Sequence, residues 1–190
     1  MVSEGLKELI PLAKCLKELG TETFEKLENR ISFQKKIYLL QACGVNLGYV
    51  FRWDQYGPYS RELARNAGIY DEGREEIDAV MDEFQFKKSV VMVLKKAKEL
   101  VTIPPDLRKI PEINEVDFVE ILSSLHFLST DEDHPENLPT DPEIINKTNI
   151  LLVSAKPHLK KYEPHLEKFW CHLYKFFPSL ENIRMQVAMV

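Results

Sequence analysis

The sequence predicts a mostly α-helical protein with one or two short strands, and three observations support this expectation. Apolar residues recur every three or four positions through most of the chain, which is the spacing of one helix face. Only 7 of the 190 residues are glycine, so few positions are suited to interrupting a helix. Residues 49–53 (YVFRW) form a short aromatic and β-branched run that is typical of a strand.

The first expected helices end at glycines. One ends at Gly20, and the next begins near Asn29, a good N-cap residue, and ends at Gly44. The apolar spacing of this second helix places Lys35 and Lys36 on its outer face.

A turn and three further helices are expected after the strand. Residues 56–59 (YGPY) form the turn signal, and Ser60 is a suitable N-cap for a short helix that Gly68 ends. Residues 71–86 and 87–101 each carry apolar residues at helical spacing.

Prolines divide the chain into two expected lobes. Pro104, Pro105 and Pro111 break the helical pattern, which separates residues 1–101 from a helical lobe over residues 112–190. The elements expected in the second lobe are a helix over 118–128, an acidic loop over 131–143, a helix capped by Thr140 or Asp141 that runs to about Ala155, an aromatic helix over 166–177 and a helical tail from Ser179.

Charge and composition narrow the classes of function. The formal charge is −5, so non-specific affinity for nucleic acid should be weak, although a local basic face could still bind DNA. No apolar run reaches the roughly 18 residues of a membrane span, and the N-terminus lacks the pattern of a secretory signal. Three widely spaced cysteines argue against a disulfide scaffold. These observations favour a cytoplasmic protein that does not bind membranes.

The motifs of common enzyme classes are missing from the sequence. It holds no phosphate-binding glycine loop, no GxSxG and no HExxH. His158, His165 and His172 are seven residues apart, and two helical turns separate side chains by about 10 Å, too far for shared ligation of one ion. We therefore expect no enzyme activity, no cofactor and no metal. The alternative is an unrecognised enzyme that uses Asp54, Glu62 or His172.

Three runs of residues lie close together in the sequence. They are residues 33–41 (FQKKIYLLQ), 47–53 (LGYVFRW) and 56–63 (YGPYSREL). This pattern resembles the YwgA-like family of uncharacterised prokaryotic proteins and, more distantly, the Panacea (SocA-like) antitoxin domain. The resemblance covers residues 29–66, about a fifth of the chain. It implies a winged-helix-like N-terminal lobe and a regulatory setting in a prokaryote.

The physical reading of the motif leaves two roles open. Tyr56 and Tyr59 flank a tight turn and are expected to pack on Trp53 and Phe51, which describes a fold-stabilising corner. The alternative is a binding surface. Its candidate residues are Arg52, Tyr56, Tyr59, Arg61 and Arg65 from the motif, joined by Lys95 of the lysine-rich segment 87–98.

The function that these observations favour is regulation by interaction. We expect a non-enzymatic protein that binds a protein partner through the motif surface and the aromatic helix 166–177. The first alternative is a DNA-binding transcription regulator in which residues 60–67, with Arg61 and Arg65, read DNA while the lysines of 87–98 contact phosphates.

Overall fold

The computed structural model describes residues 4–21, 24, 26–130 and 137–177. The expectation of a mostly α-helical protein with a few short strands is confirmed. The first half contains α1 (Glu4–Lys7), α2 (Ile10–Glu18), α3 (Leu27–Ala42), β1 (Arg52–Asp54), β2 (Gly57–Tyr59), α4 (Arg61–Glu72), α5 (Arg74–Met81) and α6 (Lys88–Leu100). The second half contains η1 (Leu107–Lys109), α7 (Glu115–Ser129), α8 (Pro142–Ala155), η2 (Pro157–His165) and α9 (Leu166–Phe176), where η marks a 3-10 helix.

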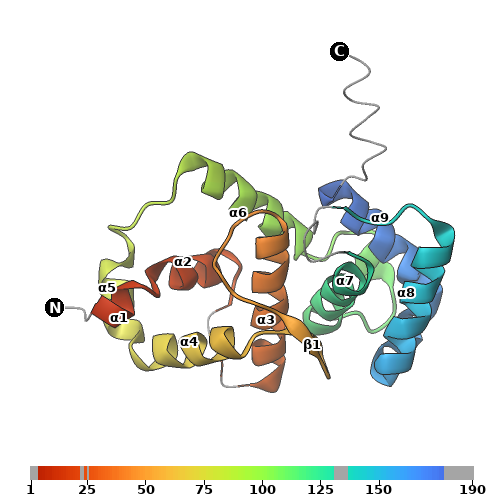
Figure 1. Cartoon of the computed structure of the whole chain (residues 1–190), viewed down its shortest axis with the longest axis horizontal. Coiled ribbons are helices and arrows are strands. Elements are labelled where there is room, and N and C mark those ends of the chain that lie inside the picture. The colour runs from red at the N-terminus through yellow and green to blue at the C-terminus, as the bar shows by residue number, and fades with distance from the viewer. Residues whose placement is uncertain (1–3, 22–23, 25, 131–136, 178–190) are drawn as a thin grey trace, which may run out of the picture.

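Helices α3 and α7 form the centre of the molecule. They make the most extensive contact between any two elements of the described chain. Figure 1 shows α2, α4 and α5 on one side of this pair and α8 and α9 on the other. Both central helices are buried on nearly all sides, as expected for helices enclosed by others. One hydrophobic core runs through both, so packing is continuous across the expected division at residues 102–111, and the two-lobe division stays a prediction.

Two expected helix starts are confirmed by their capping bonds, and one expected helix end is wrong. The Leu63 N–H donates to Ser60 Oγ at 3.3 Å at the start of α4, and the Glu143 N–H donates to Asp141 Oδ1 at 2.8 Å at the start of α8. The expected stop at Gly68 is wrong, because α4 continues to Glu72. Its buried residues Leu63, Ala67 and Tyr70 lie on both sides of Gly68, and their packing outweighs the roughly 1 kcal/mol that a glycine costs inside a helix.

The strand lies later in the sequence than expected. Strands β1 and β2 are antiparallel, with Arg52 opposite Tyr59 and Asp54 opposite Gly57. Residues 57–59 therefore belong to the second strand and not to the turn. Tyr49 has no strand opposite it. Instead the Gln41 side chain accepts from its N–H at 3.0 Å and donates to its carbonyl at 2.9 Å, so a side chain of α3 satisfies that backbone.

The aromatic helix α9 contributes to the core. Trp170 is 3% exposed and Phe177, directly after the helix, is 2% exposed. The Trp170 Nε1–H donates to Asn149 Oδ1 at 2.9 Å, which ties α9 to α8. The expectation that this helix presents its aromatic face to a partner is therefore not supported by its packing, because that face is covered by the chain itself.

Two expectations fall wholly or partly outside the described residues. These are the helical tail from Ser179 and residues 131–136 of the expected acidic loop. Within the described chain, no helix has the combination of length and apolar character that crossing a membrane requires.

Candidate functional site

Two buried lysines bind the backbone of the β1–β2 hairpin on the side that faces the rest of the protein. The Lys35 Nζ of α3 donates to the carbonyl of Pro58 at 2.8 Å. The Lys156 Nζ, which follows α8, donates to the carbonyl of Gln55 at 2.6 Å. Each lysine is 1% exposed, so both ammonium groups lie inside the protein and bind main-chain oxygen atoms of the hairpin.

A buried carboxylate partly balances these charges. Glu120 of α7 accepts from Lys156 Nζ at 2.8 Å and lies 3.3 Å from His158 Nε2. The side chains of Lys156 and Glu120 are 0% and 2% exposed, so this ion pair is removed from water. A buried charge is tolerated when it is paired and hydrogen-bonded, and Lys156 meets both conditions. Lys35, Lys156, Glu120 and the hairpin residues they hold are called the lysine mount below.

Burial dominates the electrostatics of the mount. It lowers the pKa of Lys35 from 10.5 to about 7, although the carboxylate of Glu120 opposes that shift. Lys156 contributes further to the lowering, because two ammonium groups repel each other. Burial also lowers the pKa of Lys156, and its hydrogen bond to Glu120 opposes the shift.

Gly57 lies directly on α7. Its φ is +90°, a backbone conformation that residues with a side chain rarely adopt. A Cβ at this position would lie 2.7 Å from Ser124 Oγ, closer than real contacts allow. Ser124 is fully buried, and its hydroxyl has no hydrogen-bond partner in the described chain. The glycine of the motif is thus required both by the backbone and by the close approach to α7.

One side of α3 carries polar residues that bind the segment 49–60. Gln34 accepts from the Ser60 N–H at 2.9 Å and donates to the Ser60 carbonyl at 3.0 Å. The Tyr38 hydroxyl is hydrogen-bonded to His126 Nδ1 at 2.8 Å, which joins α3 to α7. Together with Lys35 and Gln41, these residues occur at a spacing that places them along one helix face. Gln34, Lys35 and Gln41 of the FQKKIYLLQ run therefore bind the backbone of the segment that follows this helix.

The outer face of the hairpin is open. All three residues of β1 are exposed, including Trp53 at 36%. The Trp53 ring lies over Lys156 Nζ, 5.0 Å from its centroid, and 6.0 Å from the ring of Phe127. Tyr56 contacts the ring of His158 at 6.3 Å. We expected Tyr56 and Tyr59 to pack on Trp53 and Phe51. Instead, Trp53 and Tyr56 each contact residues from the second half of the chain.

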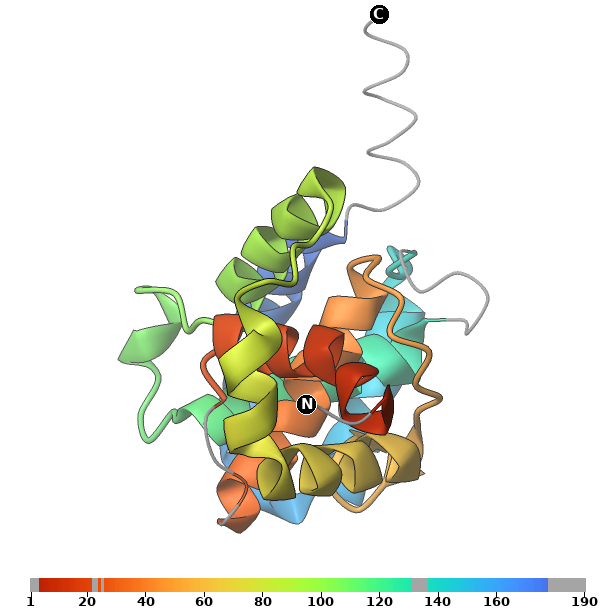
Figure 2. The same cartoon turned by 90° about the vertical axis from the view of Figure 1, so that its left-hand side faces the viewer.

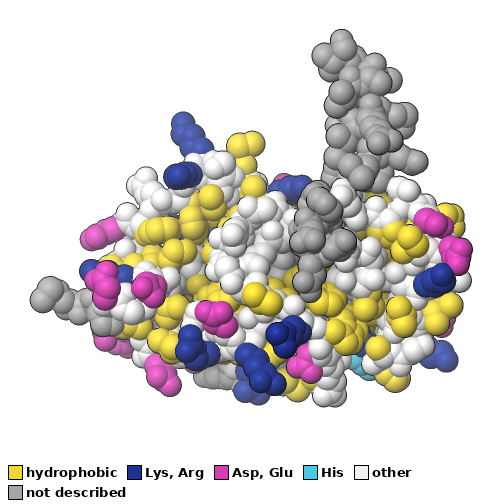
Figure 3. Space-filling view, viewed as in Figure 1, with side chains coloured by type: hydrophobic (Ala, Val, Ile, Leu, Met, Phe, Trp, Pro, Cys, Tyr) yellow, Lys and Arg dark blue, Asp and Glu magenta, His cyan; other side chains and the backbone are white. Residues whose placement is uncertain are grey.

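The predicted binding residues separate into two groups. Arg52, Arg61 and Arg65 are exposed at the hairpin and the start of α4, and Tyr56 and Tyr59 are half-buried beside them. Figure 3 shows Lys and Arg side chains along the lower edge of the molecule, with acidic side chains among them. Lys95 is exposed on α6, which lies along the upper side of the molecule in Figure 1 and Figure 2, whereas α4 lies along the lower side. The structure does not bring Lys95 together with the motif.

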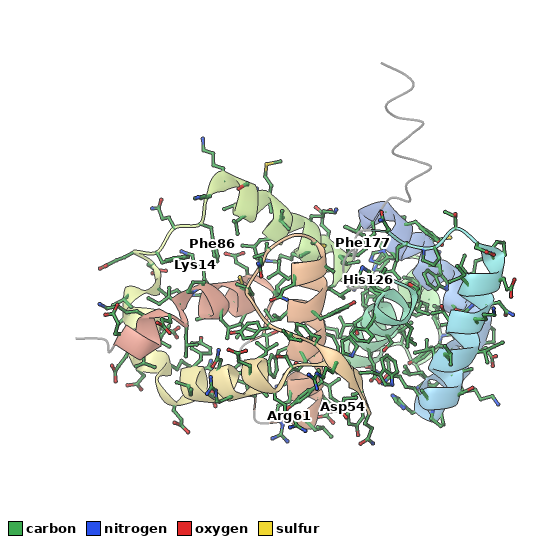
Figure 4. The ribbon with its side chains drawn as sticks, in the orientation of Figure 1. Lys14, Asp54, Arg61, Phe86, His126 and Phe177 are labelled. Atoms are coloured by element: carbon green, nitrogen blue, oxygen red, sulfur yellow. The ribbon has the colours of Figure 1, made fainter. Side chains whose placement is uncertain are left out.

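The residues of the enzyme alternative do not form a common site. Asp54 and Glu62 are exposed, and Figure 4 shows Asp54 and Arg61 on the lower edge of the molecule. His172 is 4% exposed, packs on Phe118 and bonds the Leu100 carbonyl through Nε2 at 2.9 Å. In the described part of the chain, no group of three or more His, Cys, Asp or Glu side chains is placed to hold a metal ion.

The sequence did not predict the central residues of the lysine mount. Lys35 and Lys36 are buried, so their expected place on an outer face is wrong. The apolar positions of α3 mark only one of its covered sides, and its other side is covered by the hairpin segment. Lys156 and Glu120 carry no motif. The sequence feature that could have indicated this site is Gly57 of the YGPYS run, because a glycine can mark a position where the backbone closely approaches another element.

Comparison of the chain with protein-family models, with curated proteins and with solved structures finds no match. The resemblance to the YwgA-like family and to the Panacea domain therefore stays a prediction that rests on residues 29–66.

Proposed function

We propose that this chain is a non-enzymatic regulatory protein that binds a protein partner through the outer face of the hairpin and the first turns of α4. The observation that carries the proposal is the lysine mount. It fixes the hairpin backbone through Gln55 and Pro58 on the side that faces α3 and α7, and all three residues of β1 remain exposed, although the Trp53 ring also packs on Lys156.

The mount supplies stability that the hairpin lacks. Two strands of three residues do not form a stable hairpin by themselves in water. Hydrogen bonds from Lys35, Lys156 and Gln34 replace the missing strands with contacts to the helices. A surface that is rigid before binding loses less conformational entropy when a partner arrives, and this preorganisation increases affinity.

The chemistry of the exposed face indicates the kind of partner. Trp53 is partly exposed and Val50 is 71% exposed, and the arginines Arg52, Arg61 and Arg65 lie around the hairpin and α4. Tryptophan and arginine are the residues that most often dominate binding energy at interfaces. The matching partner surface is an apolar pocket with an acidic rim.

The experiment is a pull-down with the full chain from the source cells, in which one half of each sample is treated with nuclease. The deciding variant is Arg61→Glu, and the matched control is Lys88→Glu. Both positions are exposed first residues of helices, α4 and α6, so an acidic replacement is compatible with each helix dipole and should leave the fold unchanged.

We expect a stoichiometric protein that survives nuclease, is retained by Lys88→Glu and is lost with Arg61→Glu. Equal retention by both variants would overturn the proposal. Recovery of nucleic acid alone, removed by nuclease, would replace it with the DNA-binding alternative, for which the same arginines would contact phosphates.

A further inference from the structure

Three adjoining cavities form a groove on the face that α6, η1 and the end of α2 share. The central cavity has a volume of about 420 Å³ and includes Lys36, Lys98 and Arg108 in its lining. An outer cavity of about 600 Å³ shares Lys98 and Arg108 with it, and an inner cavity of about 270 Å³ shares Lys36. We call this set of cavities the basic groove. Its lining includes none of the hairpin residues.

The charges around the central cavity favour an anion. Its lining contains three cationic side chains, Lys36, Lys98 and Arg108, and one carboxylate, Glu115, which gives 3 − 1 = +2. In the outer cavity Lys95 and Glu99 add one charge of each sign, so the excess is unchanged. This excess contrasts with the whole chain, whose formal charge is −5. Burial lowers the pKa of Lys36, and the nearby Glu115 carboxylate opposes that shift.

The cationic side chains of the groove have N–H donors that bind no acceptor among the described residues. Arg108 and Lys98 are exposed side chains, and the Arg108 Nε–H donates to the Ile103 carbonyl at 2.9 Å. Its terminal nitrogen atoms and the Lys98 ammonium have no hydrogen-bond or ion-pair partner among the described residues. The Lys36 Nζ uses one donor on the Leu19 carbonyl at 3.0 Å. A guanidinium with free terminal N–H groups matches the oxygen atoms of a phosphate.

A buried hydroxyl supplies a second, independent indication of a ligand. Thr21 is 7% exposed and lines the inner cavity, and its Oγ1 has no hydrogen-bond partner in the described chain. An unsatisfied buried hydroxyl destabilises the folded state, so such groups are usually paired. An oxygen atom of a ligand in the groove would accept from this hydroxyl.

The remaining wall of the central cavity is apolar. It is formed by Leu19, Val101, Ile103 and Ile113. A site with cationic groups beside an apolar wall fits a molecule that has an anionic end and an apolar body. Lys36 lines both the central and the inner cavity, with Arg108 on the central side and Thr21 on the inner side. We propose that the basic groove binds a small organic phosphate, with the phosphate at this junction on Lys36, between Arg108 and Thr21, and the apolar body against the apolar wall.

The positive charge also has a structural interpretation that the experiment must separate. Lys98 lies in the last turn of α6, where a cation favours the helix dipole, and this effect requires no ligand. The dipole interpretation predicts a loss of stability upon substitution. The proposal predicts a loss of binding without an equal loss of stability.

The test is a titration of the isotope-labelled full chain with phenyl phosphate, monitored by NMR through the chemical shifts of the backbone amides. The salt concentration is about 0.1 M, at which interactions between surface charges are largely screened. The variants are Arg108→Gln and Thr21→Val. The control is Lys109→Gln, an exposed cation that neighbours Arg108 and does not line the cavities. Unfolding midpoints of all variants are measured without ligand.

We expect saturable binding with a dissociation constant of about 1 mM or tighter, and shifts confined to the groove. Arg108→Gln should weaken binding about tenfold or more, Thr21→Val should weaken it severalfold, and Lys109→Gln should leave it unchanged. Inorganic phosphate should bind more weakly than phenyl phosphate because it lacks the apolar body. No saturation at about 10 mM, or equal effects of Arg108→Gln and Lys109→Gln, would overturn the proposal.

Discussion

Replacing Gly57 with alanine tests whether the hairpin really rests on α7. The new methyl group would meet two obstacles at once. The backbone φ of +90° disfavours any side chain, and the Cβ would lie 2.7 Å from Ser124 Oγ. The carbon atoms of Lys35 and Lys156 nearest to it, at 3.7 and 3.8 Å, are at ordinary contact distance and add no strain.

The expected cost of the substitution is the sum of two contributions. A left-handed backbone costs a residue with a side chain roughly 1–2 kcal/mol. Overpacking in a filled interior costs about 1–3 kcal/mol more. We therefore expect Gly57→Ala to lower the free energy of unfolding by about 2–5 kcal/mol. Gly44→Ala is the matched control, because Gly44 has a φ of +108° and a Cβ added there would have no atom within 4 Å, so it carries the first contribution alone.

The assay is urea unfolding of the two variants, of Ser124→Ala and of the double variant Gly57→Ala/Ser124→Ala. Ser124→Ala removes an unpartnered buried hydroxyl and should be neutral or slightly stabilising. In the double variant the close contact is gone, so its cost should fall to that of Gly44→Ala. Equal costs for Gly57→Ala and Gly44→Ala, or strict additivity in the double variant, would refute the close approach of the hairpin to α7.

Two further predictions concern the charges of the lysine mount. Folding lowers the pKa of Lys35 from 10.5 to about 7. Between these pH values the unfolded chain holds a proton on Lys35 that the folded chain has lost. The free energy of unfolding should therefore rise with pH in that window, by up to about 1.4 kcal/mol per pH unit. Urea unfolding at several pH values should show this rise in the parent chain relative to Lys35→Met, and parallel profiles would contradict it. Glu120→Leu should destabilise by about 3–5 kcal/mol because it leaves Lys156 buried without its carboxylate. Adding Lys156→Met should recover much of that loss in the same assay, and no recovery would refute the pairing.

The helices were predictable because their signals are local. Ser60 and Asp141 are capping residues whose side chains bind N–H groups two or three positions later, and the structure contains both bonds. The end of α4 was not predictable from Gly68, because the packing of residues before and after it decides where that helix stops. The position of the strands depends on pairing between segments, which apolar spacing does not encode.

The candidate site was predictable only in part. The motif directed attention to residues 52–65, where Arg52, Arg61 and Arg65 are exposed, and their role in binding stays a prediction. The residues that hold this surface came from elsewhere in the chain. Glu120 and Lys156 are 36 residues apart and meet only because α7 and α8 pack together.

The reason that the lysine mount leaves so little trace in the sequence is the identity of its partners. Lys35, Lys156 and Gln34 donate to carbonyl groups of Pro58, Gln55 and Ser60, and every residue has a carbonyl. A bond to the main chain places no demand on the side chain of its acceptor. The side chain of Arg52 on the outer face can therefore change without removing these bonds, whereas the ring of Trp53 packs on Lys156 and belongs partly to the mount. Substitutions of the mount should alter stability, whereas substitutions of the outer face should alter binding, so the two roles left open by the motif can be measured separately in one molecule.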